Sequence, residues 1–271
     1  MRVVTWSCRG ASAKSAVWDY LLELDPDVAL LQYVRGLPKT IESRYSVDQR
    51  HPVRRNGAPQ SYTNAVLVRG SIGNPIRLQG GAPWIDAELD RFAGNFVGLE
   101  LQPNGGPSLK AICVYNPYWP VDRKRLVGID VTAVRMPQNR DVWVGDLLWA
   151  ALYLEKPQPD DPWIVAGNFN TCETFDLGAR GPVGGREYLN RMSKLGLVDC
   201  LRSAKGVLTP TLRQIQGPVT SQNDYLFVTE ALHSRMTACD VGPRERVFEG
   251  KLSDHLPIIA DFAWEKCGAP N

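Results

Sequence analysis

The sequence predicts an α/β protein with more strands than helices, organised as one domain over residues 1–271. The chain opens with a strand-like run, a helix-like run and an apolar strand-like run, an order typical of layered α/β proteins. Many short apolar runs follow, separated by Gly, Pro and Asn. A hydrophobic content of 44% is ample for one large core, and no repeat, low-complexity tract or linker divides the chain.

The first three elements are the clearest. Residues 2–8 are predicted to be a strand, and residues 13–24 a helix that Ser12 caps and that ends before Pro26, because apolar residues recur there at helical spacing. Residues 27–34 form a continuous apolar run of strand length. Such a run is expected for a strand that is buried on both faces.

The rest of the chain continues this alternation. Few helices are apparent between the next three strands, so these strands are expected to pair largely antiparallel. They are residues 65–69, 95–101 and 109–115. Residues 121–138 show no clear pattern. The later elements are predicted as a helix at 139–154, a strand at 162–167, a helix at 187–195 ended by Gly196, and strands at 224–228 and 256–262.

Charge and cysteine usage exclude several classes of protein. A net charge of +2 gives no strong overall basic field. Two basic clusters, residues 50–55 and 123–125, are expected to be solvated faces. The six cysteines include no CxxC pair, which argues against a zinc site and favours small buried side chains in a reducing compartment. They are Cys8, Cys113, Cys172, Cys200, Cys239 and Cys267.

No export signal precedes the first strand, and the longest apolar stretch, residues 142–154, is too short to span a bilayer. The sequence therefore predicts a cytoplasmic protein without a membrane partner, taken as a monomer by default.

Polar residues gather where the predicted strands begin or end, the usual place for a site held by a stiff scaffold. They are Ser7, Arg9, Gln32, Tyr33, Tyr115, Asn116, Asn168, Asn170, Asp224, Ser253, Asp254 and His255. His255 gives the sharpest signal, because it lies between an Asp and an apolar strand. A His oriented by a carboxylate can carry or stabilise charge next to a phosphate, and Asp254 would be free to bind a cation.

Six short motifs carry a family resemblance. In chain order they are TWSCRG, LLQYV, VYNPY, VAGNFN, NDYLFV and LSDHLPI. Together they resemble the endonuclease/exonuclease/phosphatase superfamily, the deoxyribonuclease-I-like phosphodiesterases, over essentially the whole chain. The resemblance implies a four-layer α/β sandwich, in which two mostly antiparallel β-sheets pack face to face with helices outside.

The resemblance also implies roles for five residues that match the family pattern. His255 would contact the scissile phosphate or act as acid or base, and Asp224 would orient it. Asp254 would help to hold a divalent metal, Mg²⁺ or Mn²⁺. Asn170 would hydrogen-bond the phosphate and the attacking group, and Tyr115 would lie near the phosphate.

Three positions depart from the family pattern. Ser7 stands where the family has an Asn that helps to position the metal-binding groups, and Tyr33 stands where it has a metal-ligating Glu. Asn168 replaces the Asp that aligns or deprotonates the attacking water. Mg²⁺ usually takes one or two carboxylates, and an amide cannot accept a proton from water, so metal binding and nucleophile activation are expected to be weakened.

Three functions remain open at this stage. The first is a metal-dependent phosphodiesterase, endonuclease- or exonuclease-like, with a weakened or inactive half-site at Ser7, Tyr33 and Asn168. The second is a catalytically inactive relative that binds nucleic acid or a protein partner, and the third is a phosphatase acting on a small phosphoester. The expected ligand is nucleic acid or a small phosphodiester. The inositol-phosphatase branch is disfavoured, because Ala166 and Thr171 replace its Trp and Arg.

Overall fold

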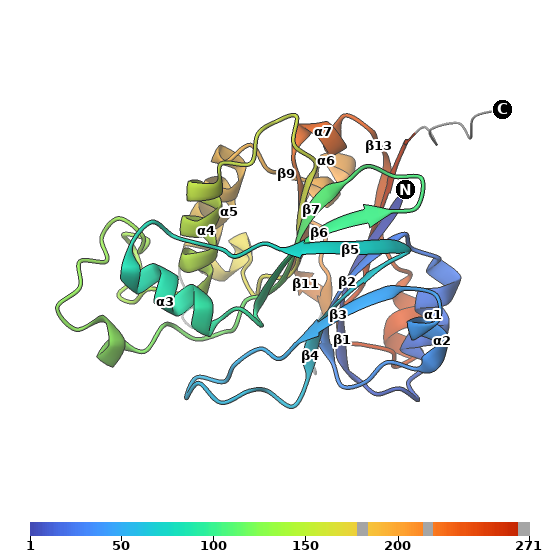
Figure 1. Ribbon diagram of the computed structural model, residues 1–271, viewed down its shortest axis with the longest axis horizontal. Coiled ribbons are helices and arrows are strands. Elements are labelled where there is room, and N and C mark those ends of the chain that lie inside the picture. The colour runs from blue at the N-terminus through green and yellow to red at the C-terminus, as the bar shows by residue number, and fades with distance from the viewer. Residues whose placement is uncertain (178–183, 214–218, 265–271) are drawn as a thin grey trace.

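Two six-stranded sheets lie face to face with helices on their outer sides, in a computed structural model that describes residues 1–177, 184–213 and 219–264 (Figure 1). The four-layer α/β sandwich implied by the family resemblance is thereby confirmed. Among the described strands, β1 with β2 and β7 with β8 pair in parallel, and the other neighbours in the two sheets are antiparallel. No helix in the described ranges is long and apolar enough to cross a membrane.

The first sheet has the order β13 (Met236–Val241), β14 (Ile258–Phe262), β1 (Arg2–Ala11), β2 (Val28–Val34), β4 (Thr63–Val68) and β3 (Ser46–Arg50). The second has the order β5 (Gly70–Pro75), β6 (Phe96–Pro103), β7 (Leu109–Tyr115), β8 (Trp163–Asn168), β12 (Asp224–Val228) and β9 (Val198–Asp199). A small ribbon is formed by β10 (Leu212–Arg213) and β11 (Val219–Ser221).

The α-helices are α1 (Val17–Leu24), α2 (Lys39–Glu42), α3 (Pro83–Arg91), α4 (Val144–Glu155), α5 (Gly185–Lys194), α6 (Cys200–Lys205) and α7 (Glu230–His233). Single turns of other helix types are η1 (Arg123–Leu126), η2 (Glu173–Leu177) and η3 (Glu245–Glu249).

Three apolar clusters separate the four layers. The central cluster lies between the sheets and includes Leu30 of β2 and Ile164 of β8. A second cluster joins β1 and β2 to α1 and η3, and a third joins β7 and β8 to α3, α4 and α5. Alternate residues of β2 enter different clusters, Leu30 the central one and Leu31 the outer one. The continuous apolar run therefore does mark a strand buried on both faces.

Several predicted boundaries were wrong. Helix α1 begins at Val17 rather than residue 13, because residues 12–15 form a turn in which the Ser15 amide donates to the Ser12 carbonyl at 2.9 Å. Ser12 therefore does not cap the helix. Helix α4 begins at Val144 rather than residue 139, and Asp146 accepts a hydrogen bond from the Trp143 amide at its start.

Several elements escaped prediction, and three of them have sequences that lack an apolar period. Strand β3 is polar, β5 is rich in Gly and Asn, and α3 is short and mixed in charge. The end of α5 was placed well, since Gly196 adopts a left-handed φ of 80° just beyond it. Five cysteines in the described ranges are free and buried, as predicted, while Cys267 lies outside those ranges.

Candidate functional site

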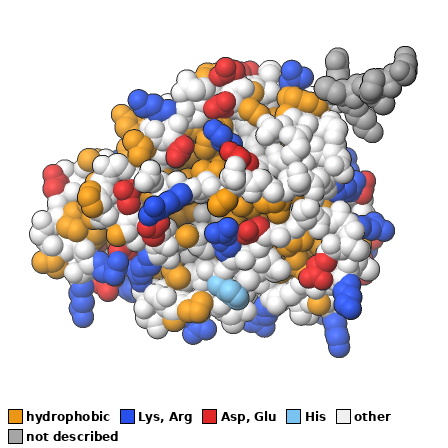
Figure 2. Space-filling view, viewed as in Figure 1, with side chains coloured by type: hydrophobic (Ala, Val, Ile, Leu, Met, Phe, Trp, Pro, Cys, Tyr) orange, Lys and Arg blue, Asp and Glu red, His pale blue; other side chains and the backbone are white. Residues whose placement is uncertain are grey.

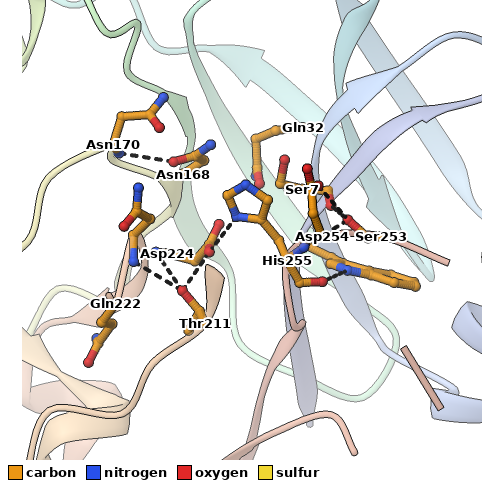
Figure 3. Close-up of polar contacts among 12 residues, drawn as sticks. Ser7, Gln32, Asn168, Asn170, Thr211, Gln222, Asp224, Ser253, Asp254 and His255 are labelled. Atoms are coloured by element: carbon orange, nitrogen blue, oxygen red, sulfur yellow. Dashed lines mark hydrogen bonds and ion pairs between the residues drawn. The ribbon is translucent and has the colours of Figure 1, made fainter. Parts of the chain in front are cut away.

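The polar residues at the strand ends come from both sheets and meet at one edge of the sandwich (Figure 3). β1 and β2 end there in the first sheet, β7 and β8 end there in the second, and β12 begins there. Three non-glycine residues adopt left-handed backbone at these ends, namely Arg9, Tyr33 and Asn170, with φ of 49°, 59° and 47°. Such conformations cost of order 1–3 kcal/mol each and cluster at functional sites.

His255 and Asp224 form a buried pair. The imidazole Nδ1 donates to Asp224 Oδ2 at 2.7 Å, and the Thr211 hydroxyl donates to the same oxygen at 2.7 Å. Because Nδ1 carries a proton, the other ring nitrogen, Nε2, is the one left to meet a ligand. The contact between His255 and Asp224 that the sequence predicted is therefore present, and Thr211 completes it.

Two further bonds tie the loop that carries His255 to β1. The Trp6 indole donates to the His255 carbonyl at 2.8 Å, and the Ser253 hydroxyl donates to the Ser7 carbonyl at 2.6 Å. The imidazole is thus fixed relative to both sheets, through Asp224 on β12 and through Trp6 on β1.

The pKa of His255 is raised above its ordinary value of 6.5. Burial lowers this pKa, but the charge and hydrogen bond of Asp224, with a smaller contribution from Asp254, raise it by more. The imidazolium form of His255 therefore persists to a higher pH than that of a histidine in water.

Asp224→Asn should lower the free energy of unfolding by about 2 kcal/mol at about pH 6, and by clearly less at about pH 9. Because the pKa of His255 is higher in the folded than in the unfolded state, its pairing with Asp224 stabilises the fold fully at a pH below the unfolded-state pKa. This stabilisation is lost as the pH rises through the folded-state pKa. Urea denaturation at the two pH values measures the effect. Asp261→Asn is the control, because its partner Arg2 stays charged throughout. An equal loss at both pH values for Asp224→Asn would mean that His255 does not titrate against it.

The end of β8 presents amide groups. Asn168 is paired in register with Asp224, which places it beside the His255 pair. Its Oδ1 accepts from the Asn170 amide at 2.9 Å, and Asn170 Nδ2 donates to the Asn116 carbonyl at 2.7 Å. Since the oxygen of Asn168 is committed to this turn, its NH₂ group is the part left to face the site.

Three tyrosines line the neighbouring strand ends. The Tyr62 hydroxyl donates to the Tyr115 hydroxyl at 2.8 Å, so the Tyr115 proton remains to be donated outward. The Tyr33 ring packs edge-on against Tyr62. Burial is the main reason why the pKa of Tyr115 is raised, and the phenol therefore stays protonated.

The groups around Asp254 do not fit Mg²⁺ or Mn²⁺. Asp254 Oδ2 lies 3.7 Å from the Arg9 Nε, so a cationic side chain already neighbours its carboxylate. Tyr33 of β2 and Ser7 of β1 carry hydroxyls, whereas hard divalent cations usually take carboxylates. In the described part of the chain, no three His, Cys, Asp or Glu side chains gather where they could hold a metal ion.

Basic side chains surround this edge. Arg35 lies over Gly10, and Arg54 lies near Tyr62. The backbone amide of Arg213 donates to the Asp254 carbonyl, and the Arg213 guanidinium lies over the Phe248 ring. All three are exposed and form no ion pair with any described residue. By contrast, Arg123 and Arg125 pair with Asp141 and Glu88. Figure 2 shows Lys and Arg side chains projecting along the lower edge of the molecule.

The structure brings the eight predicted site residues to this one edge. They are Ser7, Tyr33, Tyr115, Asn168, Asn170, Asp224, Asp254 and His255. Sequence reasoning missed Thr211 and Tyr62, because neither lies in a recognisable motif. It noted Arg9 in TWSCRG without giving it a role, although a large cationic residue before Gly10 was a usable signal.

Known structures share this fold. An AP endonuclease from Archaeoglobus fulgidus is 15% identical with a TM-score of 0.69, over 97% of this chain and 99% of that one. A 3′ phosphatase from Neisseria bound to a product DNA hairpin is 16% identical with a TM-score of 0.66, over 97% and 100%. The APE2 catalytic domain of Xenopus laevis is 17% identical with a TM-score of 0.67, over 100% and 94%. At these identities the likeness shows the fold alone.

Comparison with curated proteins gives no match. The profile described as the Endonuclease/Exonuclease/phosphatase family, however, matches residues 4–255. Because this match spans most of the sequence, the chain belongs to the endonuclease/exonuclease/phosphatase family.

Proposed function

We propose that this protein binds the phosphodiester backbone of nucleic acid at the His255 edge and has lost the metal-assisted hydrolytic step. The observation that carries the proposal is the donor character of the site. His255 Nε2, when protonated, the Asn168 NH₂ group and the Tyr115 hydroxyl all offer protons, and the second N–H of Asn170 is not used by Asn116. A group of fixed donors suits an anion with several acceptor oxygens.

The same geometry removes the means of activating water. A base must accept a proton, and the only side-chain oxygen of Asn168 already accepts the Asn170 amide. Asp224 is 1% exposed and accepts from His255 and Thr211 through Oδ2, so it is buried behind the imidazole, and Asp254 lies against Arg9. General-base assistance contributes about 10²–10⁴ in rate, so its loss alone makes hydrolysis slow.

Nucleic acid is the favoured ligand because the phosphate-binding donors lie within a rim of exposed arginines that form no ion pair with any described residue. Arg35, Arg54 and Arg213 could contact phosphates that flank the one at His255. The related Neisseria 3′ phosphatase was solved with a DNA hairpin, which is consistent with this choice. A small phosphoester would leave the rim unused.

Fluorescence anisotropy with a labelled DNA oligonucleotide in EDTA tests the proposal. Wild-type protein should bind, and His255→Gln should bind about tenfold more weakly, because Gln can still donate to Asp224 but carries no positive charge. Arg77→Gln, which removes an exposed arginine paired with Asp90, is the matched control. No binding by the wild type, or complete competition by a small phosphodiester at equal concentration, would reject nucleic acid as the ligand.

A further inference from the structure

We infer that Arg9 is a built-in cation for phosphate binding, so that the protein holds its ligand without a divalent metal. The inference rests on the proposed function and adds to it a specific residue and a metal requirement. The family resemblance implies a divalent metal at Asp254, but the groups around this carboxylate do not suit one.

Arg9 has a left-handed backbone conformation, which an arginine side chain does not favour. Arg9 has a φ of 49° and Gly10 a φ of 75°, and the register of β1 with β2 shifts between Ser7 and Ala11. Asn, Asp and Gly tolerate left-handed backbone, whereas other side chains are uncommon there. A residue chosen for this turn alone would therefore not be Arg. The strained bulge presents a guanidinium at the edge of the site, where strain is a pointer to function.

The ion pair with Asp254 places the Arg9 guanidinium next to the loop that carries His255 and leaves most of its N–H groups available. Its Nε lies 3.7 Å from Asp254 Oδ2, and its side chain remains 55% exposed. Asp254 precedes His255, whose loop is anchored to Ser7 on the same strand as Arg9. Arginine offers five donors, so the Asp254 contact can orient the side chain while most of its N–H groups stay available for a phosphate.

An ordinary surface ion pair is the competing interpretation, since exposed pairs contribute little to stability. Two features distinguish Arg9 from such a pair. It pairs with Asp254, the residue that the family resemblance assigns to the metal, at a site where Tyr33 stands in place of the metal-ligating Glu. In addition, the basic Arg35 lies over the adjacent Gly10, and Asp254 is the acidic partner that positions Arg9.

Two consequences follow for binding. A fixed guanidinium needs no bound metal to neutralise phosphate charge, so affinity should be the same in EDTA and in Mg²⁺ at equal ionic strength. Removing Arg9 should remove about one phosphate contact, which lowers the dependence of log affinity on log salt by about 1.

The test compares Arg9→Asn, Arg9→Lys and the control Arg77→Gln by oligonucleotide anisotropy, in EDTA and in Mg²⁺. Asn suits the left-handed backbone, so Arg9→Asn should fold at least as well as the wild type while binding about tenfold more weakly in both buffers. Arg9→Lys should retain part of the affinity and the wild-type salt dependence, because the charge remains. Urea denaturation checks the folding of each variant.

Two results would overturn the inference while leaving the proposed function standing. One is wild-type binding that strengthens tenfold or more when Mg²⁺ replaces EDTA. The other is unchanged affinity and salt dependence in a folded Arg9→Asn variant. Absence of oligonucleotide binding by the wild type in either buffer would instead reject the proposed function itself.

Discussion

The combined variant Ser7→Asn, Arg9→Asn, Tyr33→Glu and Asn168→Asp should cleave plasmid DNA in Mg²⁺ about 10³-fold faster than the wild type. Tyr33→Glu supplies a second carboxylate near Asp254, and Arg9→Asn removes the cation that now lies against that carboxylate. In Asn168→Asp, one oxygen can keep the Asn170 amide while the other becomes available as a base. His255, Asp224 and Asn170 match the family pattern already and are left unchanged.

The four changes should act as a unit rather than independently. Tyr33→Glu alone should gain little metal affinity while Arg9 neighbours Asp254, and Asn168→Asp alone should gain little turnover. Tyr33→Gln in the combined background is the matched control, since it has the shape of Glu without the charge. Calorimetric titration with Mg²⁺ and a gel assay of supercoiled DNA give the two readouts. Strong cleavage by the wild type, or metal binding by the combined variant without any cleavage, would contradict this account of the site.

The fold could be predicted further than the site because it depends on repeated apolar patterns. The continuous apolar run of β2 and the short apolar runs of β7 and β12 are visible in the sequence, and the order of the family motifs implied the four-layer arrangement. Strand β5 and helix α3 could not be found this way. Their placement depends on tertiary packing that overrides weak local preference.

At the site, residue types were predictable but their partners were not. His255 and Asp224 are 31 positions apart and were paired by motif. Thr211, which donates to the same carboxylate, lies in a loop without a pattern. The relation of Arg9 to Asp254 spans nearly the whole chain and depends on a left-handed turn that no propensity for Arg would suggest. Long-range contacts of this kind become visible only when both sheets are assembled.

Gly167, just before Asn168, should be the least replaceable residue of the VAGNFN motif. Its φ is 149°, and a Cβ there would lie 1.9 Å from the Val114 carbonyl oxygen of the paired strand β7. Gly167→Ala should therefore lower the free energy of unfolding by about 3 kcal/mol or more, through backbone strain and separation of β7 from β8. Urea denaturation monitored by circular dichroism measures the loss.

Gly196→Ala separates the two causes, because Gly196 also has a left-handed φ, of 80°, but a Cβ there would meet nothing within 4 Å. This control should lose only about 1 kcal/mol, the cost of a left-handed conformation for an alanine. Since Asn168 follows Gly167 directly and pairs with Asp224, displacement of β8 should also weaken oligonucleotide binding in Gly167→Ala, and Gly196→Ala should bind normally. Equal losses of stability in the two variants would show that the close approach of β8 to β7 is not the reason why position 167 requires glycine.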